Sequence, residues 1–151
     1  MLATGAKLTT IASWTITSAG TVNGTPFRVQ KRNGIRGLTA QCAFTYGSGG
    51  TSVDVKIQTS IDGGANWVDI WHATQFTTAS GRRAVALPMT TATSSTADID
   101  ATAALTAGHS QDGYLGDQIR ATYTSVGTYA GGTTVAVDVY SEQMSSTAND
   151  P

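Results

Sequence analysis

The sequence predicts an all-β fold, a single antiparallel β-sandwich or jelly-roll-like domain of about eight strands. Apolar and polar residues alternate through residues 53–61 and 133–142, which is the period of a strand with one buried face. Turn signals separate such runs at roughly 8–12-residue spacing. Amphipathic helical periodicity is almost absent, and no repeat of 20–50 residues is visible. The 151 residues suit one domain.

The first expected strands lie before residue 47. Residues 8–16 carry apolar side chains among threonines, and a turn region at 20–26 follows. Asn33-Gly34 is the strongest two-residue hairpin signal in the chain, because both residues tolerate the positive φ of a type I′ turn. We expect it to join a strand at 27–32 to a strand at 35–46.

A hairpin in the middle of the chain is the clearest local prediction. The strand at 53–61 leads into Asp62-Gly63-Gly64, where glycine reaches positive φ at little cost and aspartate can accept backbone hydrogen bonds. A second apolar run follows at 67–71. The pattern predicts two antiparallel strands joined by this turn.

Three further strands are expected at 82–88, 118–123 and 133–142. Pro88 should end the first of them, since proline has no N–H to give to a sheet. Residues 89–108 are rich in Thr, Ala and Ser with weak periodicity. This stretch is read either as an ordered surface loop or as containing a short helix at 98–104.

The expected domain organisation follows from these strands. Residues 1–10 are read as a possible N-terminal arm, 11–144 as the sandwich and 145–151 as a flexible tail. The N-terminus lacks the apolar core of a signal peptide, and no run of about 18 apolar residues occurs. We therefore expect no membrane partner and assembly in a cytoplasm.

Composition argues against nucleic-acid binding. Charged residues make up 13% of the chain, against a usual share of roughly 25%, and the net charge is −1. Phosphate recognition needs a concentrated basic face. The one basic cluster, Arg28, Lys31, Arg32 and Arg36, is better explained as a solvated turn or a docking contact.

No cofactor or metal is expected. Cys42 is the single cysteine and is read as a buried structural residue. His72 and His109 are the two histidines, and a zinc site needs three or four suitable ligands. Asp98 and Asp100 fall far short of the six to eight oxygens of a calcium site.

No enzyme is expected either. The chain lacks a G-x-S-x-G motif. Asp62 is best explained as a turn cap, and Asp54, Asp69 and Asp138 alternate with apolar neighbours and are expected to face solvent. No combination of these residues meets the requirements of a catalytic site.

Trp67 and Trp71 are separated by an even number of positions, so an unbulged strand would point both to one face. Tryptophan serves both as core and as an amphipathic contact surface. The pair is read as core or subunit contact, with a sugar-stacking platform as the alternative.

Residues 60–67, S-I-D-G-G-A-N-W, resemble the Asp-box hairpin of sialidase-like propellers, S-x-D-x-G-x-T-W, with Asn66 in place of Thr. The resemblance implies structural roles for Ser60, Asp62, Gly63, Gly64 and Trp67. Members of that family carry several copies in a much longer chain. A single copy here argues against sialidase activity.

A second resemblance covers about half of the chain. The segments Ser60–Ile70, Leu115–Thr124 and Thr133–Tyr140 together look like small β-sandwich virion proteins of tailed bacteriophages. This implies a capsid decoration or cement subunit on the outer surface of the virion, assembled in the host cytoplasm. The implied partners are the major capsid protein and further copies of the chain, with a homotrimer favoured.

Candidate partner contacts complete the predictions. The segments Met1–Thr10 and Met89–Gly108 are expected to contact the capsid. The candidate contact residues are Leu2, Lys7, Arg28, Lys31, Arg32 and Trp71. The alternative functions are a carbohydrate-binding module and a tail or neck subunit of the virion.

Overall fold

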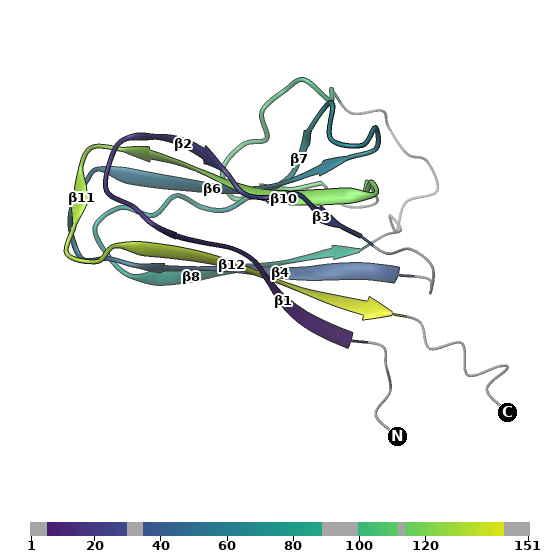
Figure 1. Cartoon of the computed structure of the whole chain (residues 1–151), viewed down its shortest axis with the longest axis horizontal. Coiled ribbons are helices and arrows are strands. Elements are labelled where there is room, and N and C mark those ends of the chain that lie inside the picture. The colour runs from purple at the N-terminus through teal and green to yellow at the C-terminus, as the bar shows by residue number, and fades with distance from the viewer. Residues whose placement is uncertain (1–5, 30–34, 89–99, 112–113, 144–151) are drawn as a thin grey trace, which may run out of the picture.

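The computed structural model describes residues 6–29, 35–88, 100–111 and 114–143. In these ranges the chain is all-β, and two main antiparallel sheets pack face to face as a sandwich (Figure 1). No helix in the described ranges is long and apolar enough to cross a membrane. The predicted fold class is confirmed.

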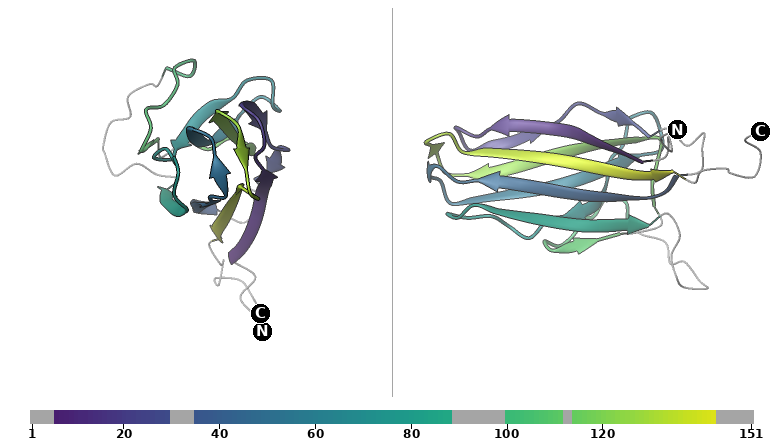
Figure 2. Two further views of the ribbon diagram at one scale, coloured as in Figure 1. Left: turned by 90° about the vertical axis from the view of Figure 1, so that its left-hand side faces the viewer. Right: turned by 90° about the horizontal axis from the view of Figure 1, so that it is seen from below.

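The first sheet has four strands in the order β1-β12-β4-β8, seen side by side in the right panel of Figure 2. Their bounds are Ala6–Thr15 for β1, Thr134–Gln143 for β12, Ile35–Thr45 for β4 and Gly81–Pro88 for β8.

The second sheet has the order β2-β10-β6-β7-β9, and β3 also pairs with β10. The bounds are Gly20–Asn23 for β2, Phe27–Arg28 for β3, Ser52–Ser60 for β6, Val68–His72 for β7, His109–Ser110 for β9 and Gln118–Val126 for β10. At one end of the sandwich, β5 (Ser48–Gly49) pairs with β11 (Tyr129–Ala130).

The core lies between the two sheets and is built by the period-two pattern. Inward-facing valines on β12 and β6 are almost fully buried, while the residues between them face outward. Phe44 stacks on Phe76 with ring centroids 5.1 Å apart, and Tyr129 meets Phe44 edge-on at 6.1 Å. Cys42 is fully buried, and burial raises the pKa of its thiol to about 12. The prediction that this cysteine is structural therefore agrees with its surroundings.

Most predicted strands appear near their expected positions, but the structure corrects three details. The described ranges hold twelve strands instead of about eight, because four short ones were missed, namely β2, β5, β9 and β11. Residues 6–10 belong to β1, so the predicted arm over 1–10 is wrong for that half. Of the two alternatives for 89–108, the short helix at 98–104 is not seen in its described part, where residues 101–103 form turns and a bend.

The predicted hairpin between 27–32 and 35–46 is also wrong. β3 pairs with β10 in the second sheet, whereas β4 pairs with β12 and β8 in the first. The chain therefore passes from one sheet to the other between these strands. Asn33-Gly34 itself lies outside the described residues. A turn signal is local, but the buried face that each strand offers decides which sheet it joins.

Candidate functional site

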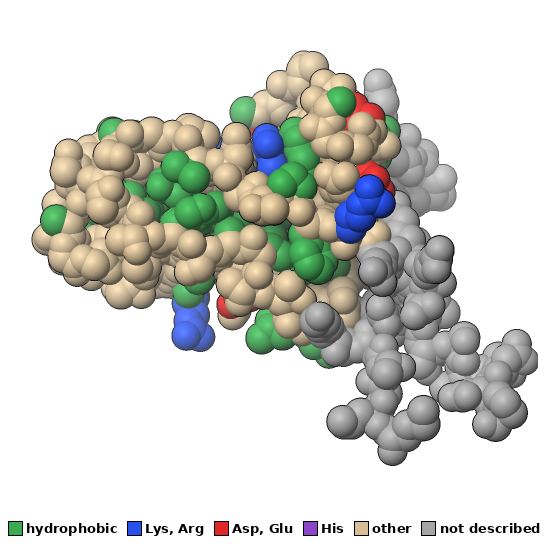
Figure 3. All heavy atoms as spheres, viewed as in Figure 1, with side chains coloured by type: hydrophobic (Ala, Val, Ile, Leu, Met, Phe, Trp, Pro, Cys, Tyr) green, Lys and Arg blue, Asp and Glu red, His purple; other side chains and the backbone are tan. Residues whose placement is uncertain are grey.

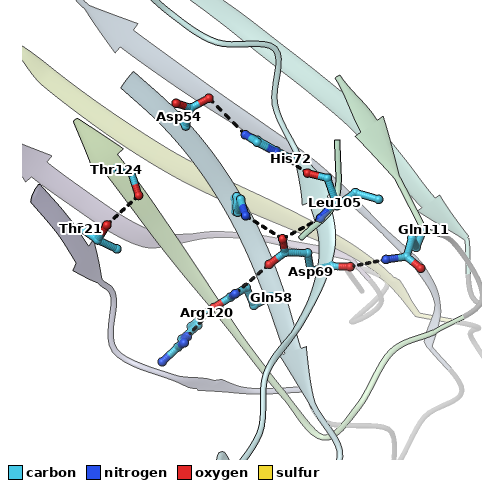
Figure 4. A network of polar contacts seen from close by, with 10 residues as sticks. Thr21, Asp54, Gln58, Asp69, His72, Leu105, Gln111, Arg120 and Thr124 are labelled. Atoms are coloured by element: carbon cyan, nitrogen blue, oxygen red, sulfur yellow. Dashed lines mark hydrogen bonds and ion pairs between the residues drawn. The ribbon is translucent and has the colours of Figure 1, made fainter. Parts of the chain in front are cut away.

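A cluster of polar side chains covers the outer face of the second sheet (Figure 4). It is built by alternation, because the residues between the buried positions of β6, β7 and β10 point away from the core. The contributing side chains are Asp54, Lys56, Gln58, Asp69, His72 and Arg120.

Asp69 lies at the centre of this cluster and is only 6% exposed. Its carboxylate accepts hydrogen bonds from Lys56 Nζ at 2.8 Å, Gln58 Nε2 at 2.7 Å and the Leu105 backbone N–H at 3.1 Å. Burial alone would raise the pKa of Asp69, but these hydrogen bonds outweigh it and hold the pKa below its ordinary value. The carboxylate is therefore ionised and held by fixed donors.

The segment at 100–111 lies over this face and is fastened to it through backbone groups. Besides the Leu105 N–H, the Leu105 carbonyl lies 2.6 Å from His72 Nδ1. His72 Nε2 is 3.2 Å from Asp54 Oδ1. Gln111 donates its side-chain amide to the Asp69 carbonyl at 2.8 Å. Asp69 thus binds the N–H of Leu105, and His72 binds the C=O of the same residue.

Arg120 links the cluster to the hairpin. Its Nε donates to Gln58 Oε1 at 2.9 Å, and its guanidinium lies 4.3 Å from the ring centroid of Trp67. Such a cation–π contact stabilises both side chains. Trp67 in turn donates from its indole nitrogen to the Gly64 carbonyl at 3.0 Å.

These contacts define what the cluster can do chemically. Among the described residues, no buried side-chain nitrogen or oxygen lacks a hydrogen-bond partner, and no group of three His, Cys, Asp or Glu residues is arranged to hold a metal ion. The lone pairs of Asp69 are engaged by the chain's own donors. The arrangement is that of a structural network that fastens a loop to a sheet.

The predicted hairpin turn between β6 and β7 is stabilised by its own side chains. Ser60 Oγ lies 2.7 Å from Asp62 Oδ1 and accepts the Gly64 N–H at 2.9 Å. The two carboxylate oxygens of Asp62 accept the Asn66 N–H at 2.9 Å and the Asn66 side-chain amide at 2.7 Å. Gly63 and Gly64 have φ of 73° and 95°, values that favour glycine. The asparagine that replaces threonine in the motif therefore has a bonding role here.

The turn predicts a loss of stability in acid. The Asn66 N–H, with help from the Asn66 and Ser60 side chains, lowers the pKa of Asp62 to about 2, against an ordinary value of 3.8. A depressed folded-state pKa contributes stability that is present above the ordinary value and is lost as pH falls toward about 2. Urea denaturation across this range should show the wild type losing its advantage over Asp62→Asn. A constant difference between the two proteins at every pH would contradict this role.

The two tryptophans do not share a face. Ile57 pairs with Trp71 but Gln58 pairs with Asp69, so a bulge at Ile70 adds one residue to β7. The parity of the strand is reversed there. Trp71 is 4% exposed and packs in the core, whereas Trp67 contacts Arg120 on the outer face. The prediction of Trp71 as a partner contact is therefore wrong, and no sugar platform made of both indoles exists.

The other predicted contact residues are scattered. Arg28 is exposed on β3, and Lys7 lies on β1, where its backbone pairs with Ser141. Leu2, Lys31 and Arg32 lie outside the described residues. Arg28 and Lys7 lie on strands of different sheets.

Sequence reasoning missed the centre of the cluster. Asp69 was expected to face solvent, but the segment at 100–111 covers it. Asp54 and Asp138 do point outward and are partly exposed, although both accept hydrogen bonds. His72 and His109 are neighbours across β7 and β9, a pairing that their separation in sequence gave no reason to expect. The signal that could have identified Asp69 is long-range and is absent from any local pattern.

Comparisons with known proteins add no assignment to this geometry. No protein-family model, no curated protein and no solved structure matches the chain.

Proposed function

We propose that this chain is a non-enzymatic structural subunit of a virus particle, a capsid decoration or cement protein that binds the outer surface of a phage head. The observation that carries the proposal is the outer face of the first sheet. Most residues that point outward from β4 and β8 are short, and Thr39, Thr45, Ala84 and Ala86 are exposed; the longer side chains among them are Gln41 and Arg82. In Figure 2, right panel, the four strands of this sheet lie nearest the viewer, with none of the other described strands in front of them.

A face of this kind suits a broad protein contact. Alanine has no side-chain rotamer freedom to lose on burial, and threonine has little, so docking such a face costs little conformational entropy. Asp138, on a central strand of the sheet, is already bonded to Thr10 Oγ1 at 2.6 Å and to Gln41 Nε2 at 3.1 Å. Its charge therefore keeps bonding partners when water is excluded.

Both sequence-predicted contact segments border the first sheet in sequence, and one of them supports the same face. Glu142 pairs with both Ala6 and Gly37, and Gly37 pairs with Pro88. The start of β1 and the end of β8 therefore lie at one end of the first sheet. The segments 1–5 and 89–99, which are themselves outside the described residues, continue the chain from these two points. The described part of the second segment, 100–108, lies over the outer face of the second sheet, so only the first segment, whose residues 6–10 belong to β1, supports the flat face.

The proposal predicts that charge on this face abolishes capsid binding. Thr39 and Ala86 are exposed Cα partners, so Thr39→Glu with Ala86→Glu places two like charges side by side. Co-sedimentation with capsids of the phage that encodes the chain should fall at least tenfold. The matched control, Ala65→Glu with Ala130→Glu, adds the same charge at exposed positions on other surfaces. Equal retention of both variants at wild-type occupancy would overturn the proposal.

A homo-oligomer is part of this proposal, with the trimer implied by the resemblance to virion proteins. Many symmetric copies on a lattice would add avidity to a modest individual contact. The trimer rests on that resemblance alone.

A further inference from the structure

The sandwich has four strand edges, and three of them are protected against pairing with another strand. β8 carries Arg82 and Arg83 and ends at Pro88. β9 has two residues. β2 and β3 are short and are separated by Gly24-Thr25-Pro26. Charged residues, proline and shortness are the devices by which natural proteins prevent edge-to-edge association.

The fourth edge, β1, lacks most of these devices. It is ten residues long, carries Lys7 as its one charged residue, and pairs on one side only among the described strands. Its one irregularity is the bulge between Thr10 and Ala12, which leaves Ala6–Thr10 as a regular segment. The outward backbone groups of this segment are available to a further strand.

Apolar side chains stand beside the same segment. Leu8 is 63% exposed, and its Cα partner Tyr140 is 38% exposed. Figure 3 looks onto the side that β1 crosses and shows apolar side chains in a band between the two sheets. Val22 and Phe27, on β2 and β3, are also exposed. A strand paired with Ala6–Thr10 would lie beside Leu8.

We infer that β1 pairs antiparallel with β1 of a second copy of this chain, about a two-fold axis near Leu8. A second copy has the same four edges, and β1 is the one that lacks most of the protective features. The two copies therefore pair through the same strand, β1. An axis at Leu8 places Leu8 beside its symmetry mate, with Tyr140 of each copy next to it. Lys7 then stands opposite Thr9 of the other copy, so no like charges face each other across the ladder.

This inference is independent of the proposed function. Leu8 and its Cα partner Tyr140 point to the same outer face as Asp138, so the variants separate the two ideas: Thr39→Glu with Ala86→Glu tests capsid binding, and Leu8→Lys tests self-association. A two-fold contact forms a dimer by itself, and any three-fold contact would use a different surface. The area that this short segment can bury is small compared with a standard interface of about 800 Å² per partner. The dimer should therefore dissociate on dilution.

Light scattering on the whole chain over a concentration series tests the inference. The expected mass rises from 15.5 kDa toward twice that value. Leu8→Lys should remain monomeric, because it removes the apolar contact and sets two charges side by side. Two controls should behave as wild type. Val126→Lys changes another exposed apolar residue, and Ala86→Lys adds charge at the β8 edge.

Amide hydrogen exchange provides a second readout that does not depend on the variants. Exchange in Ala6–Thr10 of the wild type should slow as concentration rises, while exchange in β8 should not change. A wild type that stays monomeric at its highest soluble concentration would overturn the inference. So would an oligomer whose mass Leu8→Lys leaves unchanged, or one that protects β8 instead of β1.

Discussion

Gly50→Ala is expected to lower the free energy of unfolding by about 2–5 kcal/mol. Gly50 has φ of 66°, and a left-handed backbone costs an L-residue about 1–2 kcal/mol. An added Cβ would also fall within the ring of Tyr129, which is 1% exposed and packs against Phe44. Forcing an extra carbon into packed core costs about 1–3 kcal/mol more. Urea denaturation measures the change.

Gly132→Ala is the matched control for this prediction. Gly132 has φ of 75°, but nothing lies within 4 Å of an added Cβ. Its substitution should therefore lower the free energy of unfolding only by the cost of the left-handed backbone, about 1–2 kcal/mol. If the two variants lose equal stability, the packing of Tyr129 against Gly50 does not contribute, and our account of this end of the sandwich is wrong.

Asp69→Ala should lower the free energy of unfolding by a comparable amount, about 3–5 kcal/mol, because the polar cluster is lost. Removing one member of a buried ion pair leaves its partners without a counter-charge. Here Lys56 loses its counter-ion, and Gln58 and the Leu105 N–H lose their acceptor. Lys56 is 23% exposed and can turn toward water, which favours the lower end of this range. The segment at 100–111 should also loosen, with faster amide exchange at Leu105.

Asp138→Ala provides the comparison for Asp69. Asp138 is also an outward-facing aspartate on a central strand, and its carboxylate accepts two side-chain hydrogen bonds. Asp138 holds no loop against the sheet and is partly exposed. Asp138→Ala should therefore lower the free energy of unfolding by about 1 kcal/mol. A similar loss in both variants, with unchanged exchange at Leu105, would mean that Asp69 does not fasten the segment.

Local pattern was enough to predict most of the long strands. Val53, Val55 and Ile57 are fully buried, as their alternation indicates, and so are Val135 and Val137. Asp62 accepts the backbone and side-chain hydrogen bonds expected of a turn cap. In each case the information lies within a few residues of the position concerned.

The remaining features depend on contacts between distant parts of the chain. Asp69 is buried by a segment about 36 positions away, and the residues next to Asp69 in sequence do not predict this burial. The bulge at Ile70 reverses the faces of Trp67 and Trp71, although their spacing is even. β3 joins β10 because of the edge it completes, not because of the turn residues that follow it. Period and propensity do not contain this information.

The position of β12 has a consequence for how the molecule is made. β12 lies between β1 and β4, so Thr10 bonds to Asp138 across 128 positions of sequence. On a ribosome, β1 emerges long before the strand it pairs with, and the first sheet has no centre until β12 has left the exit tunnel. High contact order makes such closure slow, and the second sheet has its hairpin ready earlier. During synthesis both edges of β1 therefore stay unpaired until β12 is available. The main risk of this topology is that nascent chains pair prematurely through β1.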